Sequence, residues 1–120
     1  MTDLVERLVS EELWVLFRQV VPPAEVKRPQ GGGRRRAGDR ECLAAIIFVA
    51  TSGCTWRQLP PTFGPAWPTV YRRFVGWSRD RVWAELDRAI SDEPGAGGQL
   101  DWPRCAIDCV SLRAAQAGYY

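Results

Sequence analysis

The sequence contains no histidine, which removes the side chain that most often acts as a general base near neutral pH. Nucleophile systems that pair serine or cysteine with histidine are therefore not expected, nor are hydrolases of that type. The cysteines also lack the paired C-x-x-C spacing of a zinc site. We expect reduced, mostly buried thiols at Cys42, Cys54, Cys105 and Cys109.

Long apolar runs are absent as well. No stretch approaches the roughly 18 to 20 apolar residues that cross a bilayer, and the first residues carry acids where a secretion signal carries positive charge. We therefore expect a cytoplasmic protein with no membrane partner. With 120 residues, 46% of them hydrophobic, the chain is long enough for one modest core.

The net charge of +2 averages over three unlike segments. Residues 1–26 carry two arginines against five acids, and residues 82–120 carry three arginines against six acids. Between them, residues 27–81 carry eleven basic residues against three acids, and ten of the eleven are arginine. Arginine holds phosphate oxygens in pairs and can read a guanine edge, so this excess predicts a polyanionic partner. A solvated basic face without a ligand is the alternative.

The sequence of the first half of the chain predicts two helices joined by a basic arm. Ser10 is expected to cap an amphipathic helix that ends at Pro22-Pro23. Residues 27–38, KRPQGGGRRRAG, cannot bury enough apolar surface to order themselves, and we interpret them as a flexible arm that contacts DNA. A plain linker is the alternative. Asp39 is then expected to cap a central apolar helix that Gly53 ends.

After this central helix the sequence predicts a helix-turn-helix. A short helix at 55–59 is followed by a turn with Gly64, and a second helix runs from about Thr69 to Ser78. Helix, glycine-bearing turn and helix are typical of a module whose second helix enters the major groove. Asp80 is expected to cap a last helix.

The second helix of this module is the predicted recognition helix. Val70, Phe74 and Trp77 share one face of it, so Arg72 and Arg73 are expected to point outward. Phosphate and base contacts are expected near its N-terminus, where backbone N–H groups also favour phosphate. The residues that we expect to contact DNA are Arg34, Arg35, Arg36, Arg40, Arg57, Thr69, Tyr71, Arg72, Arg73 and Arg79.

The composition changes again towards the C-terminus. Residues 91–103 are expected to form a linker rich in glycine, proline and acids, which separates a helical domain over 1–90 from residues 104–120. The run RCAIDCVS is interpreted as a buried strand that contains Asp108. A carboxylate in such a run is costly unless it has a function.

Residues 52–83, SGCTWRQLPPTFGPAWPTVYRRFVGWSRDRVW, closely resemble the amino-terminal domain of IS5-type insertion-sequence transposases. The preceding GGRRRAGDRECLAAIIFVATSGC resembles the same family, and the likeness extends over roughly residues 10–115. The chain departs from the family pattern at Trp67-Pro68, where a small residue more often caps the recognition helix.

The resemblance implies a mainly α fold: a small helical bundle with a helix-turn-helix-like module, then a linker and the first strand of a ribonuclease-H-like domain. It implies double-stranded DNA, in the form of terminal inverted repeats, as the partner of a bacterial, nucleoid-associated protein. In the resembling enzymes a strand ending in Ile-Asp supplies the first carboxylate of an Asp-Asp-Glu triad, and Asp108 matches that position.

No acid follows Asp108, so the second Asp and the Glu of that triad are missing. Because the triad serves to hold two divalent ions, Mg²⁺ is expected only in a completed enzyme, and no cofactor is expected for this chain. We expect the DNA-binding portion of a transposase, as an upstream-frame or truncated product that is not itself an enzyme.

Two alternatives come from other classes of protein. In the first, Asp108 joins an active transposase after frameshifting or by complementation. In the second, the chain is a small helical interaction module whose six tryptophans form a binding surface. We also consider two further partners, which are full-length transposase and a second copy of the chain. If this product competed with the full enzyme, it would act as an inhibitor.

Overall fold

The computed structural model describes residues 3–23, 38–93 and 98–119, and over these residues the protein is built from helices without strands. The mainly α fold predicted from the sequence is confirmed. In chain order the elements are α1 (Leu4–Leu8), α2 (Glu11–Val20), α3 (Asp39–Ser52), the short 3-10 helices η1 (Trp56–Gln58) and η2 (Pro61–Phe63), α4 (Trp67–Arg79), α5 (Val82–Asp92) and α6 (Asp101–Gln116).

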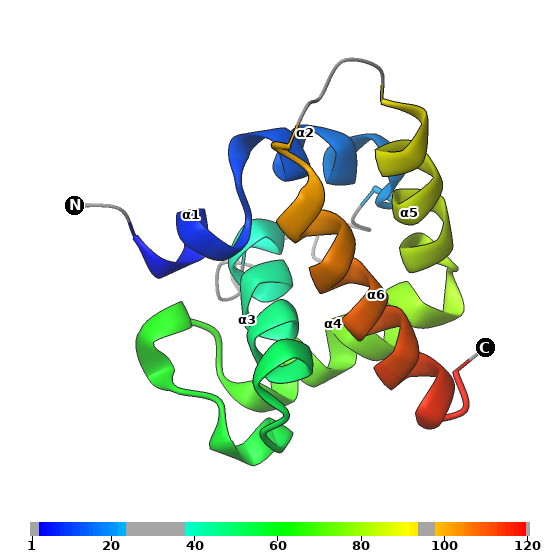
Figure 1. The fold of residues 1–120 in the computed structure, drawn as a ribbon. Helices are drawn as coiled ribbons and strands as arrows, with labels where there is room; N and C mark the ends of the chain where they lie inside the picture. The colour runs from blue at the N-terminus through cyan, green and yellow to red at the C-terminus, as the bar shows by residue number, and fades with distance from the viewer. Residues whose placement is uncertain (1–2, 24–37, 94–97, 120) are drawn as a thin grey trace, which may run out of the picture.

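Helix α3 lies at the centre of the bundle, with α1, α4 and α6 packed around it (Figure 1). It is apolar nearly all round, and residues 42–47 are all buried, which is the pattern of a helix enclosed by others. It ends, as expected, at Gly53, whose φ of 76° suits a residue without a side chain. Its N-cap is Gly38 and not Asp39, which is the first helical residue.

Helix α2 matches its prediction closely. The Ser10 hydroxyl accepts a hydrogen bond of 3.3 Å from the Leu13 backbone amide and so caps the helix. The face with Leu13, Leu16 and Phe17 is buried, and α2 contacts α5. Ring contacts strengthen this side of the core, because Phe17 meets Trp77 of α4 edge to face at 4.9 Å between ring centroids.

The predicted strand over 104–111 is wrong, because these residues lie in the middle of α6. Ala106, Ile107, Val110 and Ala114 are buried at the spacing of a helix face. A lone strand would leave its backbone groups without partners, whereas a helix satisfies them internally and still buries the apolar residues. On this helix Asp108 falls on the exposed side.

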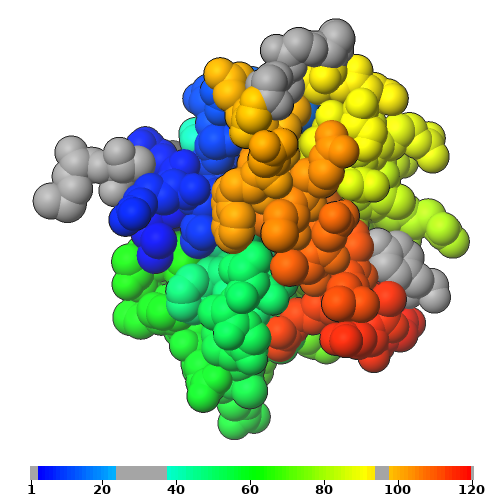
Figure 2. All heavy atoms as spheres, in the orientation of Figure 1, coloured from blue at the N-terminus to red at the C-terminus, as the bar shows by residue number. Residues whose placement is uncertain are grey.

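Helix α6 contributes buried residues to the core of the bundle. It packs against α3 and α5, and it runs across the face of the molecule beside α3 in Figure 2. The Arg113 guanidinium donates a 3.0 Å hydrogen bond to the carbonyl of Cys54, just past the end of α3, and lies 5.2 Å from the ring centroid of Trp56. Part of the predicted linker, Asp101 to Pro103, is the first turn of α6.

None of the helices in the described residues is both long enough and apolar enough to cross a membrane.

Candidate nucleic-acid interface

Helix α4 has an apolar face and, opposite to it, a basic face. Val70, Phe74 and Trp77 are buried, as the sequence predicted, and α4 packs against α3 and α5. The helix begins at Trp67 with proline in its first turn, slightly earlier than expected. The opposite face carries four residues at spacings of three, four and three, which place them in one line along the helix. We call this line the arginine stripe; it consists of Thr69, Arg72, Gly76 and Arg79.

Two neighbouring arginines of α4 have different surroundings. Arg72 is exposed on the arginine stripe, as predicted. Arg73 instead donates a 2.9 Å hydrogen bond from its Nη1 to the Oδ1 of Asp39, and the two side chains are only 14% and 22% exposed. One residue turns a helix by about 100°, which points Arg73 towards the start of α3. The prediction that both arginines point outward is therefore correct for Arg72 and wrong for Arg73.

Tyr71 is held by the C-terminal segment. Its hydroxyl lies 2.5 Å from the hydroxyl of Tyr119, and this hydrogen bond, followed by burial, raises the pKa of Tyr71 above its usual value. The ring of Tyr119 also contacts the guanidinium of Arg79, 5.7 Å from the ring centroid. The segment after α6 therefore positions two of the residues that were expected to contact DNA.

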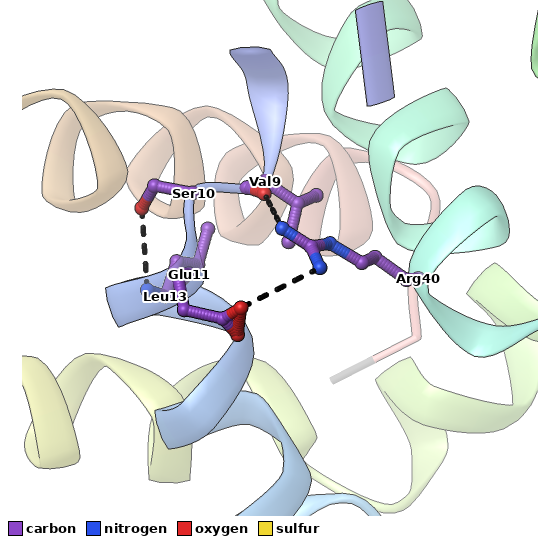
Figure 3. A network of polar contacts seen from close by, with 5 residues as sticks. All are labelled: Val9, Ser10, Glu11, Leu13 and Arg40. Carbon is purple, nitrogen blue, oxygen red and sulfur yellow. Dashed lines mark hydrogen bonds and ion pairs between the residues drawn. The ribbon is translucent and has the colours of Figure 1, made fainter. Parts of the chain in front are cut away.

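Arg40 fastens the α1–α2 junction to α3 (Figure 3). Its Nη2 donates a 2.8 Å hydrogen bond to the carbonyl of Val9, and its Nη1 lies 3.9 Å from Oε1 of Glu11. Its guanidinium also lies 5.8 Å from the ring centroid of Trp14. These contacts give Arg40 a structural role that the sequence analysis did not foresee.

The remaining candidates are Arg57 and the three arginines of the arm. Arg57 is exposed, and its guanidinium lies 5.5 Å from the ring centroid of Trp67, so it adds positive charge at the start of α4. Arg34, Arg35 and Arg36 lie outside the described residues, as does the rest of the predicted arm except Gly38.

The segment between α3 and α4 differs from the predicted helix-turn-helix. The short helix expected over 55–59 is the 3-10 helix η1, and a second 3-10 helix, η2, follows it before α4 begins. The amide of Thr55 donates a 2.9 Å hydrogen bond to the side-chain oxygen of Gln58, which caps the N-terminus of η1. Proline at positions 60 and 61 then prevents a longer helix. Helix α4 packs mainly against α3 and α5, and η1 contacts it as well.

The described side chains do not fit the pair of Mg²⁺ ions that a complete transposase is expected to hold. Asp108 is exposed on α6, and among the described residues no three His, Cys, Asp or Glu side chains lie together as a metal site. Burial raises the pKa of the neighbouring Cys109 thiol, with a further contribution from Cys105. The four cysteines form no disulfide with one another. The prediction that they are mostly buried is wrong, because only Cys42 is buried and Cys105 is exposed. The Cys42 sulfur accepts a 3.3 Å hydrogen bond from Nη1 of Arg73.

Arg81, between α4 and α5, is the one non-glycine residue with positive φ in the described chain. Its φ of 62° and ψ of 30° are left-handed, and it precedes α5, where Asp80 was expected to be the cap. This conformation costs a side-chain-bearing residue roughly 1–2 kcal/mol.

Replacing Arg81 with Gly is therefore expected to raise the free energy of unfolding by about 1 kcal/mol, because glycine adopts positive φ freely. Thermal unfolding followed by circular dichroism measures the effect as a Tm increase of a few degrees. Arg88 is exposed in the interior of α5, so Arg88→Gly is the matched control and is expected to lower Tm. A lower Tm for Arg81→Gly would show that contacts of the arginine outweigh the backbone strain.

Two residues that hold parts of the bundle together had no signal in the sequence. Arg113 and Tyr119 act on groups 59 and 48 residues earlier in the chain. Neither belongs to a motif, and such contacts become visible only when α6 is placed on the bundle.

The described part of the chain is thus a small helical domain that presents arginines along one exposed helix face. A family model described as "Putative transposase of IS4/5 family (DUF4096)" matches residues 9–86. The chain belongs to this family.

Two curated proteins are similar to almost the whole chain. An insertion element IS402 uncharacterized 16.2 kDa protein of Burkholderia cepacia is 33% identical over 116 residues, which are 96% of this chain and 79% of that protein. Uncharacterized protein y4sN of Sinorhizobium fredii is 29% identical over 108 residues, covering 90% of this chain and 78% of that protein. No solved structure matches significantly.

Proposed function

We propose that this chain binds the terminal inverted repeats of its insertion element through α4. The observation that carries the proposal is the arginine stripe, on which Arg72 and Arg79 are exposed two turns apart while the opposite face of the helix is fixed in the core. Exposed Arg57 and Arg81 add charge near the two ends of α4. Guanidinium groups arranged in this way suit the phosphates of a duplex.

Membership in a transposase family supports DNA as the polyanion. The similar protein of Burkholderia cepacia is named for an insertion element, IS402. The proposal assigns no catalytic step to Asp108, which lies on the outer side of α6. The role of the arm with Arg34, Arg35 and Arg36 stays a prediction from the sequence.

Fluorescence anisotropy with two labelled duplexes tests this function. One duplex carries the terminal repeat of the element that encodes the chain, and the other has the same composition in scrambled order. We expect tighter binding to the repeat, and a logarithm of the binding constant that falls linearly with the logarithm of salt concentration, with a slope of about −0.9 per phosphate contacted.

The experiment tests DNA binding and recognition of the terminal repeat separately. Equal affinity for both duplexes contradicts recognition of the repeat, and the chain is then a general DNA binder. Absence of binding to either duplex at low salt contradicts DNA binding altogether and favours an interaction module.

A further inference from the structure

Gly76 lies in a helix although glycine has a low helix propensity. It lies within α4, and glycine is the least favourable residue in a helix apart from proline. The Gly76 carbonyl accepts a hydrogen bond from the amide of Asp80, so the backbone here is helical. A β-carbon at this position would meet no other part of the described chain within 4 Å. Packing within the protein therefore does not require glycine here.

Gly76 also occupies a particular place on the arginine stripe. Arg72 and Arg79 lie about one turn before it and one turn after it on the same exposed face, so the two guanidinium groups bracket a bare stretch of helix backbone. Glycine is favoured wherever a helix or loop backbone must come close to a ligand. The ligand of this surface, under the proposed function, is duplex DNA.

We propose that Gly76 is the point at which the DNA surface comes into direct contact with α4, while Arg72 and Arg79 bind phosphates on either side of it. This inference rests on the proposed function and adds a steric requirement to it. The contact lies in the second half of the helix, whereas Tyr71, near the N-terminus, is occupied by Tyr119. Stability and DNA binding make opposite demands at this position, because any larger residue except proline improves the helix and obstructs the duplex.

Two variants test the opposite effects on stability and on DNA binding. Gly76→Ala and Gly76→Gln are both expected to raise Tm by about 3 °C, because alanine and glutamine are better helix formers than glycine. The same variants are expected to weaken binding to duplex DNA, by a few-fold for alanine and by tenfold or more for the longer glutamine. Because the obstruction is steric, the loss should be similar for the terminal repeat and for the scrambled duplex.

Ala115→Gln is the matched control. It places the same side chain on an exposed position of a different helix, α6, and is expected to leave the affinity for both duplexes unchanged. If the wild-type chain binds DNA and Arg72→Ala weakens that binding, but Gly76→Gln binds as tightly as wild type, this inference is overturned and the proposed function stands. A loss confined to the terminal repeat, or a fall in Tm for Gly76→Ala, also overturns it. If the wild-type chain binds neither duplex, both proposals fail.

Discussion

Replacing Ile107 with Asp is expected to unfold the protein. Ile107 lies in α6 with its side chain fully buried, so the variant loses apolar contacts and places a carboxylate where no cation is available among the core residues. Burial of an unpaired charge costs several kcal/mol, which is comparable with the whole stability of a domain of this size. Circular dichroism should show loss of the cooperative thermal transition.

Leu112→Asp is the control for this variant. It makes a closely similar chemical change on the same helix, but Leu112 is 60% exposed, so the free energy of unfolding should change by less than about 0.5 kcal/mol. The milder Ile107→Ala, expected to cost about 2–5 kcal/mol, gives a measurable value if the Asp variant cannot be purified. Should Ile107→Asp unfold at the wild-type temperature, α6 would be peripheral to the bundle, and a domain boundary near residue 103 would be favoured.

This prediction depends on the part of the fold that the sequence did not reveal. The run RCAIDCVS has apolar residues at spacings compatible with a strand or with a helix, and local pattern alone does not decide between them. What decides is the surface available for packing, because a helix at this position packs its apolar side against both α3 and α5. On α6, Ile107 and Val110 enter the core and Asp108 turns outward.

The elements that were predicted correctly are those with a repeated apolar spacing and a clear stop. Helix α3 combines an apolar interior with Gly53 at its end, and α4 carries Val70, Phe74 and Trp77 on one face. These signals are local, so the sequence alone suffices. The site was predicted less well, since a sequence shows that Arg73 and Arg40 are basic but not that Asp39 and the carbonyl of Val9 hold them.

Arg72→Ala and Arg73→Ala are expected to act on different properties of the protein, although the two residues are adjacent. Arg72 is exposed on the arginine stripe, so its removal should leave Tm unchanged and weaken DNA binding by about 1 kcal/mol, with a salt slope smaller by roughly one phosphate. Arg73 is bound to Asp39 in a largely buried pair that joins α4 to α3. Its removal should lower the free energy of unfolding by about 2 kcal/mol, because a charged hydrogen bond is lost.

Urea denaturation measures the stability of the two variants, and anisotropy at several salt concentrations measures their DNA binding. Below the Tm of Arg73→Ala, the salt slope of that variant should equal that of the wild type, because Arg73 contributes to the position of α4 and not to the number of phosphates bound. Arg88→Ala on α5 controls for the loss of one surface charge and should change neither property by a comparable amount. If Arg73→Ala lowers the salt slope as Arg72→Ala does, the ion pair with Asp39 opens when DNA binds, and Arg73 belongs to the interface as the sequence predicted.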